Sequence, residues 1–236
     1  MNKKYDAILF DLDGTLLPMD NDEFTKGYFS LLAKTLAPYG YTAETMIAAM
    51  WRGVAAMVKN DGSRKNSDAF WEVFASILGE KVYDDIPKFD AFYDKEFHAA
   101  KAFTQPTESS PLAVSLAREK AGCVVLATNP MFPFVAVKSR MGWTGLTPEM
   151  FDLITDYDNS GSCKPNPYYY TEIAKKLGVE PSHCLMIGNN ADEDIAAAKA
   201  VGMDTFLVTD CLIAKGDIPE TKKGSFDDMI EFLRNI

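Results

Sequence analysis

Two aspartates near the start of the chain lie two positions apart and are followed by a glycine. They belong to the segment Asp11-Leu12-Asp13-Gly14-Thr15, which comes directly after a mostly apolar run. Carboxylates this close repel each other unless a cation lies between them or one of them is protonated. Because magnesium prefers oxygen ligands and takes few of them from protein, the pair suits Mg²⁺. The alternative is an ordinary Asp13-Gly14 turn, with Asp11 at a solvated strand end.

A buried parallel sheet is the element that we expect to position these carboxylates. The run from Tyr5 to Leu12 has the pattern of a strand that is covered on both faces. Similar runs occupy residues 123–127, 184–187 and 205–208, and a weaker one occupies residues 151–155. Open parallel sheets bind ligands at the carboxyl ends of their strands, which is where Asp11 and Asp13 would lie.

Capped helices are expected to alternate with these strands. Capping residues and first-turn prolines mark three of them: Ser110-Pro111 to Gly122, Asn166-Pro167 to Gly178, and a last helix that opens with Ser225 and Asp228. The alternation of strand and helix predicts the α/β class, as a doubly wound, Rossmann-like parallel sheet.

Helical patterns without a convincing strand fill the region between Pro18 and Phe103. Four sets of apolar residues each share one helix face: Phe24, Tyr28, Leu31, Leu32 and Leu36; Met46, Met50, Val54 and Met57; Phe70, Val73, Phe74, Ile77 and Leu78; and Phe89, Phe92, Tyr93 and Phe97. We interpret these side chains as core and not as a ligand-binding box. The sequence thus predicts an α/β core domain of residues 1–18 and 104–236 with an inserted helical-bundle domain of residues 19–103.

Composition disfavours several classes of function. Asp and Glu outnumber Lys and Arg by 34 to 24, and the formal net charge of −10 opposes binding to nucleic acid or to an anionic membrane. With His98 and His183 as its only histidines, the chain cannot build a multi-histidine zinc site. The four cysteines are too few for a disulfide framework, and no apolar run approaches the ~20 residues of a membrane span. We expect a cytoplasmic protein.

The segment Asp11-Leu12-Asp13-Gly14-Thr15 resembles the first motif of the haloacid dehalogenase superfamily, most of whose members are magnesium-dependent phosphatases. Three later segments resemble the remaining motifs of that family in the same order: Thr128-Asn129, Lys164-Pro165-Asn166-Pro167, and residues 188–194. The resemblance spans the α/β part of the chain, and the helical insertion resembles the family's smaller cap domain. It also implies that the strands lie in the order third, second, first, fourth, fifth.

The resemblance implies a catalytic role for each matching residue. Asp11 would attack phosphorus and form an aspartyl-phosphate, which water then hydrolyses. Asp13 would act as a general acid and base on the leaving oxygen and on the water. The Thr128 hydroxyl, the Asn129 backbone amide and the Lys164 ammonium would bind the phosphoryl oxygens and stabilise their transition-state charge.

The resemblance also implies four magnesium ligands: Asp11, Asp13, Asn189 and Asp194. The family's commonest pattern has an aspartate directly after the glycine of the fourth motif, where this chain has Asn189. At about 4 Å and an effective dielectric constant near 20, one charge pair is worth roughly 4 kcal/mol, so we expect weaker magnesium binding. Asp192 and Glu193 are nearby acids that could supply the missing charge, or could equally serve as charges at a helix N-terminus.

These motifs predict a magnesium-dependent phosphatase that hydrolyses a small phosphorylated metabolite. The acid at Asp13 favours this reaction, because the resemblance implies that dehalogenating members lack an acid there. Two alternatives stay open: a phosphosugar mutase of the same superfamily, and a catalytically weak protein that binds a phosphorylated ligand for regulation. We expect substrate choice to lie in cap side chains such as Arg52, Lys59, Arg64 or Lys101, and the sequence defines neither the substrate nor the oligomeric state.

Overall fold

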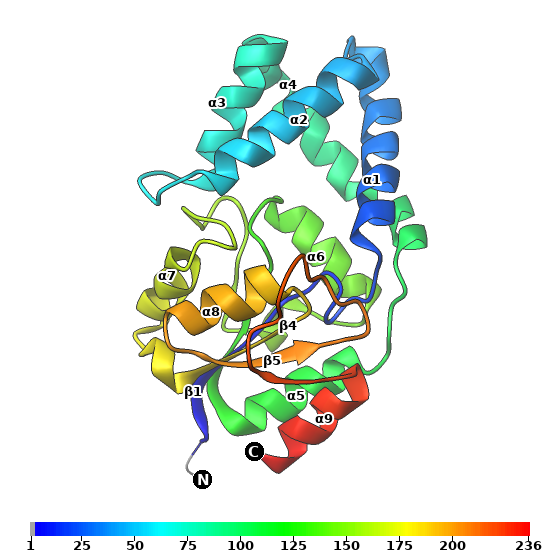
Figure 1. Cartoon of the computed structure of the whole chain (residues 1–236). Helices are drawn as coiled ribbons and strands as arrows, with labels where there is room; N and C mark the ends of the chain where they lie inside the picture. Colours follow the sequence, from blue (N-terminus) through cyan, green and yellow to red (C-terminus); the bar gives the residue numbers. More distant parts are fainter. Residues whose placement is uncertain (1–2) are drawn as a thin grey trace.

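Six parallel strands form one sheet in the lower part of the molecule in Figure 1. The structure is a computed structural model that describes residues 3–236, so the first two residues of the predicted core domain lie outside the described range. The strands are β1 (Tyr5–Phe10), β2 (Ala121–Leu126), β3 (Leu153–Ile154), β4 (Cys184–Gly188), β5 (Asp204–Val208) and β6 (Lys222–Gly224). Their order, β3-β2-β1-β4-β5-β6, confirms the predicted order of the first five strands.

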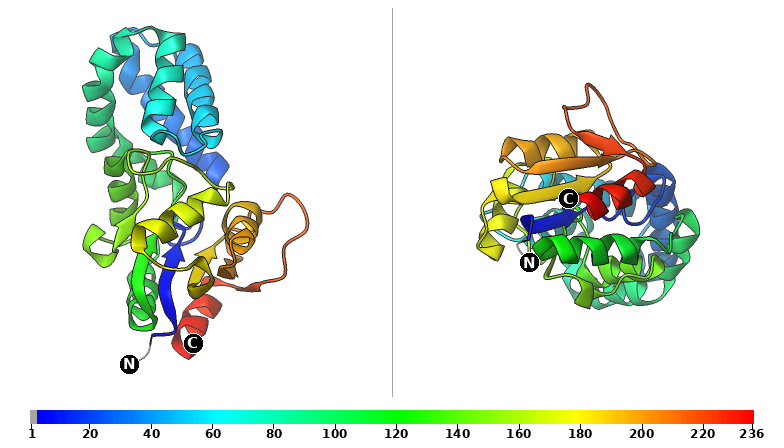
Figure 2. Two further views of the ribbon diagram at one scale, coloured as in Figure 1. Left: turned by 90° about the vertical axis from the view of Figure 1, so that its left-hand side faces the viewer. Right: turned by 90° about the horizontal axis from the view of Figure 1, so that it is seen from below.

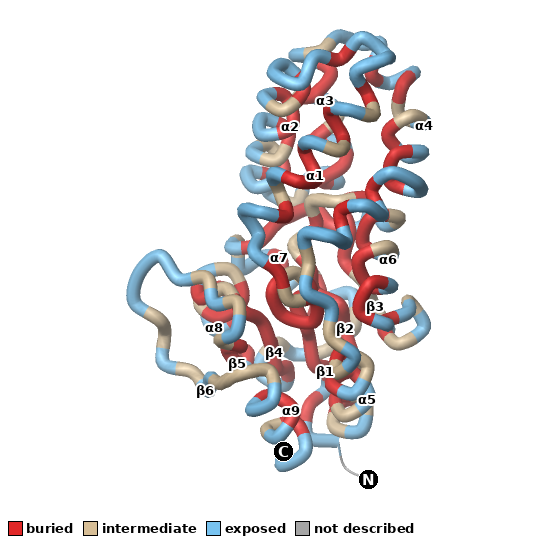
Figure 3. The backbone as a smooth tube through the Cα atoms, turned by 90° about the vertical axis from the view of Figure 1, so that its right-hand side faces the viewer, coloured by how far each residue is buried: buried red, intermediate tan, exposed pale blue. Residues whose placement is uncertain are grey.

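The centre of the sheet is apolar on both faces, as the runs of apolar residues predict. Ile8 of β1 pairs with Val124 of β2 on one side and with Leu185 of β4 on the other, and all three are buried. Figure 3 shows the neighbouring strands as buried tubes along most of their length. The edge strand β6 was not predicted, because its sequence Lys-Lys-Gly carries no apolar pattern and pairing with β5 alone defines it.

Helices cover both faces of the sheet and confirm the doubly wound α/β class. One face packs against α5 (Ser110–Lys120), α6 (Phe134–Trp143) and α9 (Phe226–Asn235). The other packs against α7 (Tyr168–Leu177) and α8 (Ala197–Ala200), which follows a π-helical turn, η5 (Ala191–Ala196). The short 3-10 helices η3 (Pro148–Met150) and η4 (Pro181–His183) lie in connecting loops.

The predicted helix boundaries are right for α7 and α9 and wrong at one end of α5. The α7 helix ends before Gly178, which has a left-handed conformation, and Ser225 forms a reciprocal capping box with Asp228 at the start of α9. Gly122 does not end α5, which stops at Lys120; it lies inside β2. A Cβ at Gly122 would lie 2.8 Å from the Asp6 carbonyl oxygen, so close strand packing is what requires this glycine.

A separate group of helices stands beyond the carboxyl end of β1, which points toward it in the left view of Figure 2. We call this segment the helical group; it consists of α1 (Asn21–Leu36), η1 (Ala37–Tyr39), α2 (Ala43–Val58), α3 (Asn66–Leu78), α4 (Lys81–Asp94) and η2 (Glu96–Phe103). Most of the predicted apolar faces are buried in it. Ile77 is the exception: it is 46% exposed, because Phe70 and Phe74 carry the packing of α3.

The chain leaves the core for the helical group and returns to it at one place. Met19 and Thr104 form an antiparallel bridge, and the Gln105 backbone N–H donates to the Pro18 carbonyl. The predicted division into two domains at residues 18/19 and 103/104 stays a prediction. Among residues 3–236, no helix combines the length and apolarity that crossing a membrane requires.

The helical group also contacts the core at the start of α3. The Asn66 side chain is fully buried and donates to the carbonyls of Pro130 and Ser162, each at 3.2 Å. The Asn66 backbone N–H donates to the Ser160 carbonyl, and the next backbone N–H, that of Ser67, donates to the Tyr157 carbonyl. Asn66 therefore adds polar contacts to the paired connecting segments and to the packing of Phe97 on Phe132 and Trp143.

The buried carboxylate of Asp85 joins α4 to the loop between η1 and α2. Asp85 accepts hydrogen bonds from the Tyr41 hydroxyl at 2.6 Å and from Lys88 at 2.5 Å, and Lys81 lies 3.3 Å away. The bonds from Lys88 and Tyr41 lower the pKa of Asp85 to about 2. The charged form of Asp85 therefore stabilises the folded helical group.

We expect Asp85→Asn to destabilise the protein near neutral pH and to have little effect in acid. Because the folded pKa of about 2 lies below the ~3.9 of an unfolded aspartate, the charge contributes fully above about pH 4 and its contribution is lost as the pH falls toward 2. Urea unfolding at pH 6 should show a loss of about 1–2 kcal/mol. The exposed neighbour Asp84 provides the control: if Asp84→Asn gave the same pH dependence, the Asp85 network would not be the cause.

Candidate active site

Residues from the first, third and fourth motifs meet beyond the carboxyl ends of β1 and β4. Asp11 directly follows β1, and its backbone N–H donates to the Ile187 carbonyl of β4. The Lys164 ammonium lies between two carboxylates, 2.8 Å from Asp11 Oδ1 and 2.6 Å from Asp194 Oδ1. All three side chains are buried, so residues up to 183 positions apart in the sequence form one charged cluster.

The two carboxylates decide the charge of Lys164. Burial alone would lower the pKa of this ammonium, but Asp11 and Asp194 outweigh burial and hold the pKa well above its ordinary value. Burial raises the pKa of Asp194, whose second oxygen accepts a 2.9 Å hydrogen bond from the Asn190 backbone N–H. Lys164 is therefore a fixed positive charge beside Asp11.

The fourth motif forms a π-helical turn, and its three acids have different contacts. The Asn190 side chain caps this turn, η5, by accepting from the backbone N–H groups of Asp192 and Glu193, each at 3.1 Å. Asp194 faces Lys164, Glu193 accepts a bond from the second motif, and Asp192 is exposed. Of the three acids of the fourth motif, Asp194 is the one that forms an ion pair with Lys164.

The Asp13 carboxylate forms an ion pair with Arg140 of α6. Arg140 is fully buried, and its guanidinium carbon lies 4.3 Å from the centre of the Phe132 ring. Asp13 Oδ1 and Arg140 Nη2 are buried without a hydrogen-bond partner among the described residues. Burial raises the pKa of Asp13 and Arg140 opposes the shift, so the balance favours the protonated acid more than in water.

The second motif lies beside the cluster and is tied to the third and fourth motifs. The Asn129 side chain donates to Glu193 at 2.9 Å and accepts from the Lys164 backbone N–H at 3.2 Å. Thr128 is buried, and its carbonyl accepts hydrogen bonds from Thr155 and Tyr169. These bonds fix the loop that follows β2.

Asn189 joins the fourth motif to the first. Its amide oxygen accepts from the Thr15 hydroxyl at 3.1 Å, and its amide nitrogen donates to the Cys211 carbonyl at 2.6 Å. Gly14 has a φ of +89°, and a Cβ there would lie 2.2 Å from the Asn189 amide nitrogen. Glycine is therefore required both by the turn and by the close approach of Asn189.

The oxygen donors at this site suit magnesium. Among residues 3–236, no three His, Cys, Asp or Glu side chains form a group that could hold a metal ion. Magnesium does not need one, since it is commonly held by one or two carboxylates together with substrate oxygens and water. Asp11, Asp194 and Asn189 supply two carboxylates and an amide oxygen at neighbouring strand ends. The carboxylate of Asp13, the fourth predicted ligand, is bound to Arg140, and its role as a ligand stays a prediction.

The family model of haloacid dehalogenase-like hydrolases matches residues 5–202 of this chain, which includes all four motifs. The chain belongs to this family. It is therefore a hydrolase of the haloacid dehalogenase type, as the resemblance of its motifs implies.

Curated relatives extend over almost the whole chain. A phosphoglycolate phosphatase of Aquifex aeolicus is 25% identical and covers 97% of this chain and 97% of its own length. A glyceraldehyde 3-phosphate phosphatase of Methanopyrus kandleri is also 25% identical, over 96% of this chain and 91% of its own. Relatives of this haloacid dehalogenase-type hydrolase are thus named for small phosphate esters.

Solved structures share the fold at lower sequence identity. The hydrolase YfnB of Bacillus subtilis, described as bound to magnesium and as revealing interdomain movement, has a TM-score of 0.59 at 18% identity and covers 99% of this chain and 100% of its own. A 2-haloacid dehalogenase of Pseudomonas syringae has a TM-score of 0.64 at 14% identity, over 98% and 99% of the two chains. These likenesses support the fold of the family and do not separate its reactions.

Sequence reasoning missed Arg140 and Thr15. An arginine that follows Lys138 and Ser139 in a helix has the sequence pattern of an exposed residue, and its partner Asp13 lies 127 positions away. Thr15 was noted only as the end of the first motif, although its hydroxyl bridges Asn189 and, at 3.5 Å, Asp11. The contacts of both residues could be identified only from the folded structure, in which the strand ends lie together.

We expect Arg140→Met to destabilise the protein by about 3 kcal/mol, because it leaves the largely buried Asp13 carboxylate without its partner. The double variant Arg140→Met with Asp13→Asn should regain part of this loss in urea unfolding. Arg234→Met, which breaks an exposed ion pair, is the control and should cost less than about 0.5 kcal/mol. Purely additive effects of the two site substitutions would contradict the coupling of Arg140 to Asp13.

Proposed function

We propose that this hydrolase is a phosphatase that cleaves a small phosphorylated metabolite through an aspartyl-phosphate on Asp11. The observation that carries the proposal is the Lys164 ammonium, fixed between Asp11 and Asp194 at the strand ends. A buried positive charge beside a carboxylate attracts an anionic phosphoryl group to the carboxylate that would attack it. The phosphatase names of the relatives support the same substrate class.

Lys164 also selects the attacking oxygen. It donates to Asp11 Oδ1 at 2.8 Å, whereas the hydrogen bond to Oδ2 within residues 3–236 is the long 3.5 Å contact from Thr15. In the proposed reaction, Oδ2 forms the bond to phosphorus and the bond from phosphorus to the leaving oxygen breaks. The Thr128 hydroxyl and the Asn129 backbone N–H are the proposed further donors to the phosphoryl oxygens.

Asp13 is the proposed source of the proton for the leaving oxygen. Its Oδ2 is paired with Arg140, so the proton is held at Oδ1, which has no partner among the described residues. After the alcohol leaves, the same carboxylate takes a proton from the water that attacks the aspartyl-phosphate. Arg140 is a positioning residue, because it acts on the substrate only through Asp13.

Magnesium would be held by Asp11, Asp194 and the Asn189 amide oxygen. When bound, the ion would supply positive charge to the phosphoryl oxygens. Asn189 should weaken the binding of magnesium here, because its amide supplies an oxygen donor without a negative charge.

Release of inorganic phosphate from a panel of phosphorylated metabolites tests the proposed function. We expect Asp11→Asn to lower turnover at least ~10³-fold while leaving the melting temperature unchanged, because the amide keeps the bond from Lys164 but does not attack phosphorus. Asp192→Asn, on the exposed acid of the fourth motif, should keep normal turnover. Near-normal phosphate release by Asp11→Asn would refute the aspartyl-phosphate. Isomerisation of a hexose 1-phosphate without phosphate release would instead indicate the mutase.

Asn189→Asp should lower the magnesium concentration for half-maximal activity, because a carboxylate adds the missing charge. The new oxygen would face the Cys211 carbonyl that Asn189 Nδ2 now contacts, so without magnesium the variant should melt at a lower temperature than the wild type. Titrations of activity and of melting temperature with magnesium measure both effects. An unchanged or higher half-saturation would show that Asp194 or Glu193 already supplies the charge.

A further inference from the structure

Glu193 is an acid of the fourth motif to which the proposed reaction gives no task. It directly precedes Asp194 in the π-helical turn η5, but its side chain contacts the loop of the second motif. Its Oε2 accepts a hydrogen bond of 2.9 Å from the side-chain nitrogen of Asn129, which lies 64 positions earlier in the chain. The bond thus connects the loops that follow β2 and β4, two strands that β1 separates in the sheet.

The backbone of Glu193 is held on both sides of this side chain. Its N–H donates to the Asn190 side-chain oxygen at 3.1 Å, and its carbonyl accepts from the Tyr170 hydroxyl of α7 at 2.8 Å. The side chain itself is half-buried, so water has limited access to its contact with Asn129. A hydrogen bond to a carboxylate is stronger than one between neutral groups, and Glu193 makes this bond from a fixed position.

The carboxylate of Glu193 selects the orientation of the Asn129 amide. An amide has a donor end and an acceptor end, whereas an ionised carboxylate only accepts hydrogen bonds. Glu193 therefore requires the amide nitrogen, and the amide oxygen turns toward the third motif. There Asn129 Oδ1 accepts from the Lys164 backbone N–H at 3.2 Å, and Nδ2 lies 3.4 Å from the Lys164 carbonyl oxygen. The orientation of one amide thus determines the hydrogen bonds of the Lys164 backbone.

This chain of hydrogen bonds leads to two proposed donors of the phosphoryl site, the Asn129 backbone N–H and the Lys164 ammonium. Rotation of the Asn129 amide would remove the acceptor of the Lys164 backbone N–H and allow both donors to shift. Donors to the charge that develops in a transition state must be placed accurately, and an error of about 1 Å can lower a rate ~100-fold. A side chain that fixes the amide therefore contributes to the rate without contacting the substrate.

We propose that Glu193 is a positioning residue for phosphoryl transfer, which acts through its hydrogen bond to Asn129. The inference rests on the proposed phosphatase function. It gives the three acids of the fourth motif different places: Asp194 pairs with Lys164, Glu193 orients Asn129, and Asp192 is exposed. In this account the oxygen of Glu193 that accepts the bond matters, and its negative charge is not needed by the magnesium ion.

Steady-state kinetics with acetyl phosphate and the binding of orthovanadate, which resembles a phosphoryl group in transfer, test this inference. Glu193→Ala removes the acceptor, so kcat should fall at least ~10-fold while KM changes less than ~3-fold, because the displaced donors act mainly in the transition state. The Kd of orthovanadate should rise for the same reason. Glu193→Gln keeps an oxygen that accepts from Asn129, and it should restore kcat to within ~3-fold of the wild type at an unchanged magnesium requirement. Asp192→Ala, on the exposed neighbour, is the matched control and should change none of these quantities.

Each result separates the inference from the proposed function. A normal kcat in Glu193→Ala would overturn the inference. An equal loss in Glu193→Gln would overturn it as well, and a higher magnesium concentration for half-maximal activity in that variant would assign the effect to charge. If the wild type released no phosphate, but orthovanadate affinity still fell in Glu193→Ala and recovered in Glu193→Gln, the proposed function would fail and the positioning role would stand.

A double-mutant cycle measures the contribution of the bond itself. Asn129→Ala removes the donor of the bond and keeps the backbone N–H at that position. Because Glu193 is proposed to act through this side chain, Glu193→Ala should lower kcat less than ~2-fold further when Asn129 is already alanine. Melting temperatures of all variants show whether a lost rate reflects unfolding. Multiplicative effects of the two substitutions on kcat would contradict the coupling of Glu193 to Asn129.

Discussion

The Lys164 ammonium shared by Asp11 and Asp194 is the interaction on which the site depends. Three charges are buried together, and desolvating them is tolerable only because each carboxylate lies within 3 Å of the ammonium. The sheet order supplies this geometry, since it places β1 beside β4 and so brings Asp11 next to the fourth motif. With one ammonium and two carboxylates, the cluster keeps a net negative charge that a bound cation would offset.

Arg140 and Asp13 form a second buried ion pair, whose contacts differ from those of Lys164. Lys164 places a positive charge beside Asp11, whereas Arg140 binds Asp13 and stacks on Phe132. Phe132 also lines the cavity between the helical group and the core. The ion pair of Arg140 with Asp13 is thus linked through one aromatic ring to the boundary between the two parts of the chain.

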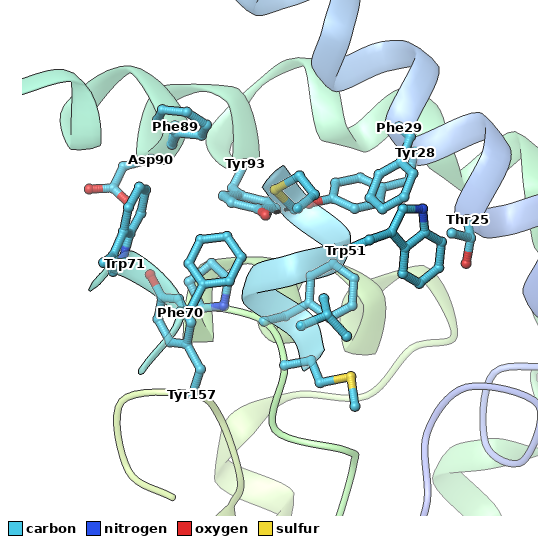
Figure 4. Close-up of a pocket in the computed structure, with 15 residues that line it drawn as sticks. Thr25, Tyr28, Phe29, Trp51, Phe70, Trp71, Phe89, Asp90, Tyr93 and Tyr157 are labelled. Carbon is cyan, nitrogen blue, oxygen red and sulfur yellow. Dashed lines mark hydrogen bonds between the residues drawn. The ribbon is translucent and has the colours of Figure 1, made fainter. Parts of the chain in front are cut away.

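The sequence was sufficient for those parts of the fold that depend on local patterns. Buried strands are visible as apolar runs, and the ends of parallel strands lie together, so Asp11 and the fourth motif with Asp194 could be expected to meet. The place of Lys164 beside them was implied only by the family resemblance. The burial of Arg140 could not be expected, because it depends on an ion pair with Asp13, which is distant in the sequence. Strand β6 could not be expected either, because only its backbone pairing with β5 defines it. The cavity that Figure 4 shows between the helical group and the core was hidden for another reason: helical spacing of aromatic residues is the same whether they fill a core or surround a cavity.

Asn66 has a consequence for how far the helical group can be displaced from the core. It is fully buried and bonds the core at Pro130, Ser160 and Ser162, on loops far in sequence from the Met19 and Thr104 connection. A displacement of the helical group about that connection would break these bonds together with the packing of Phe97 on Phe132 and Trp143. The bonds of a buried polar side chain depend on direction as well as distance, so they define one orientation of the helical group where aromatic packing alone would tolerate several.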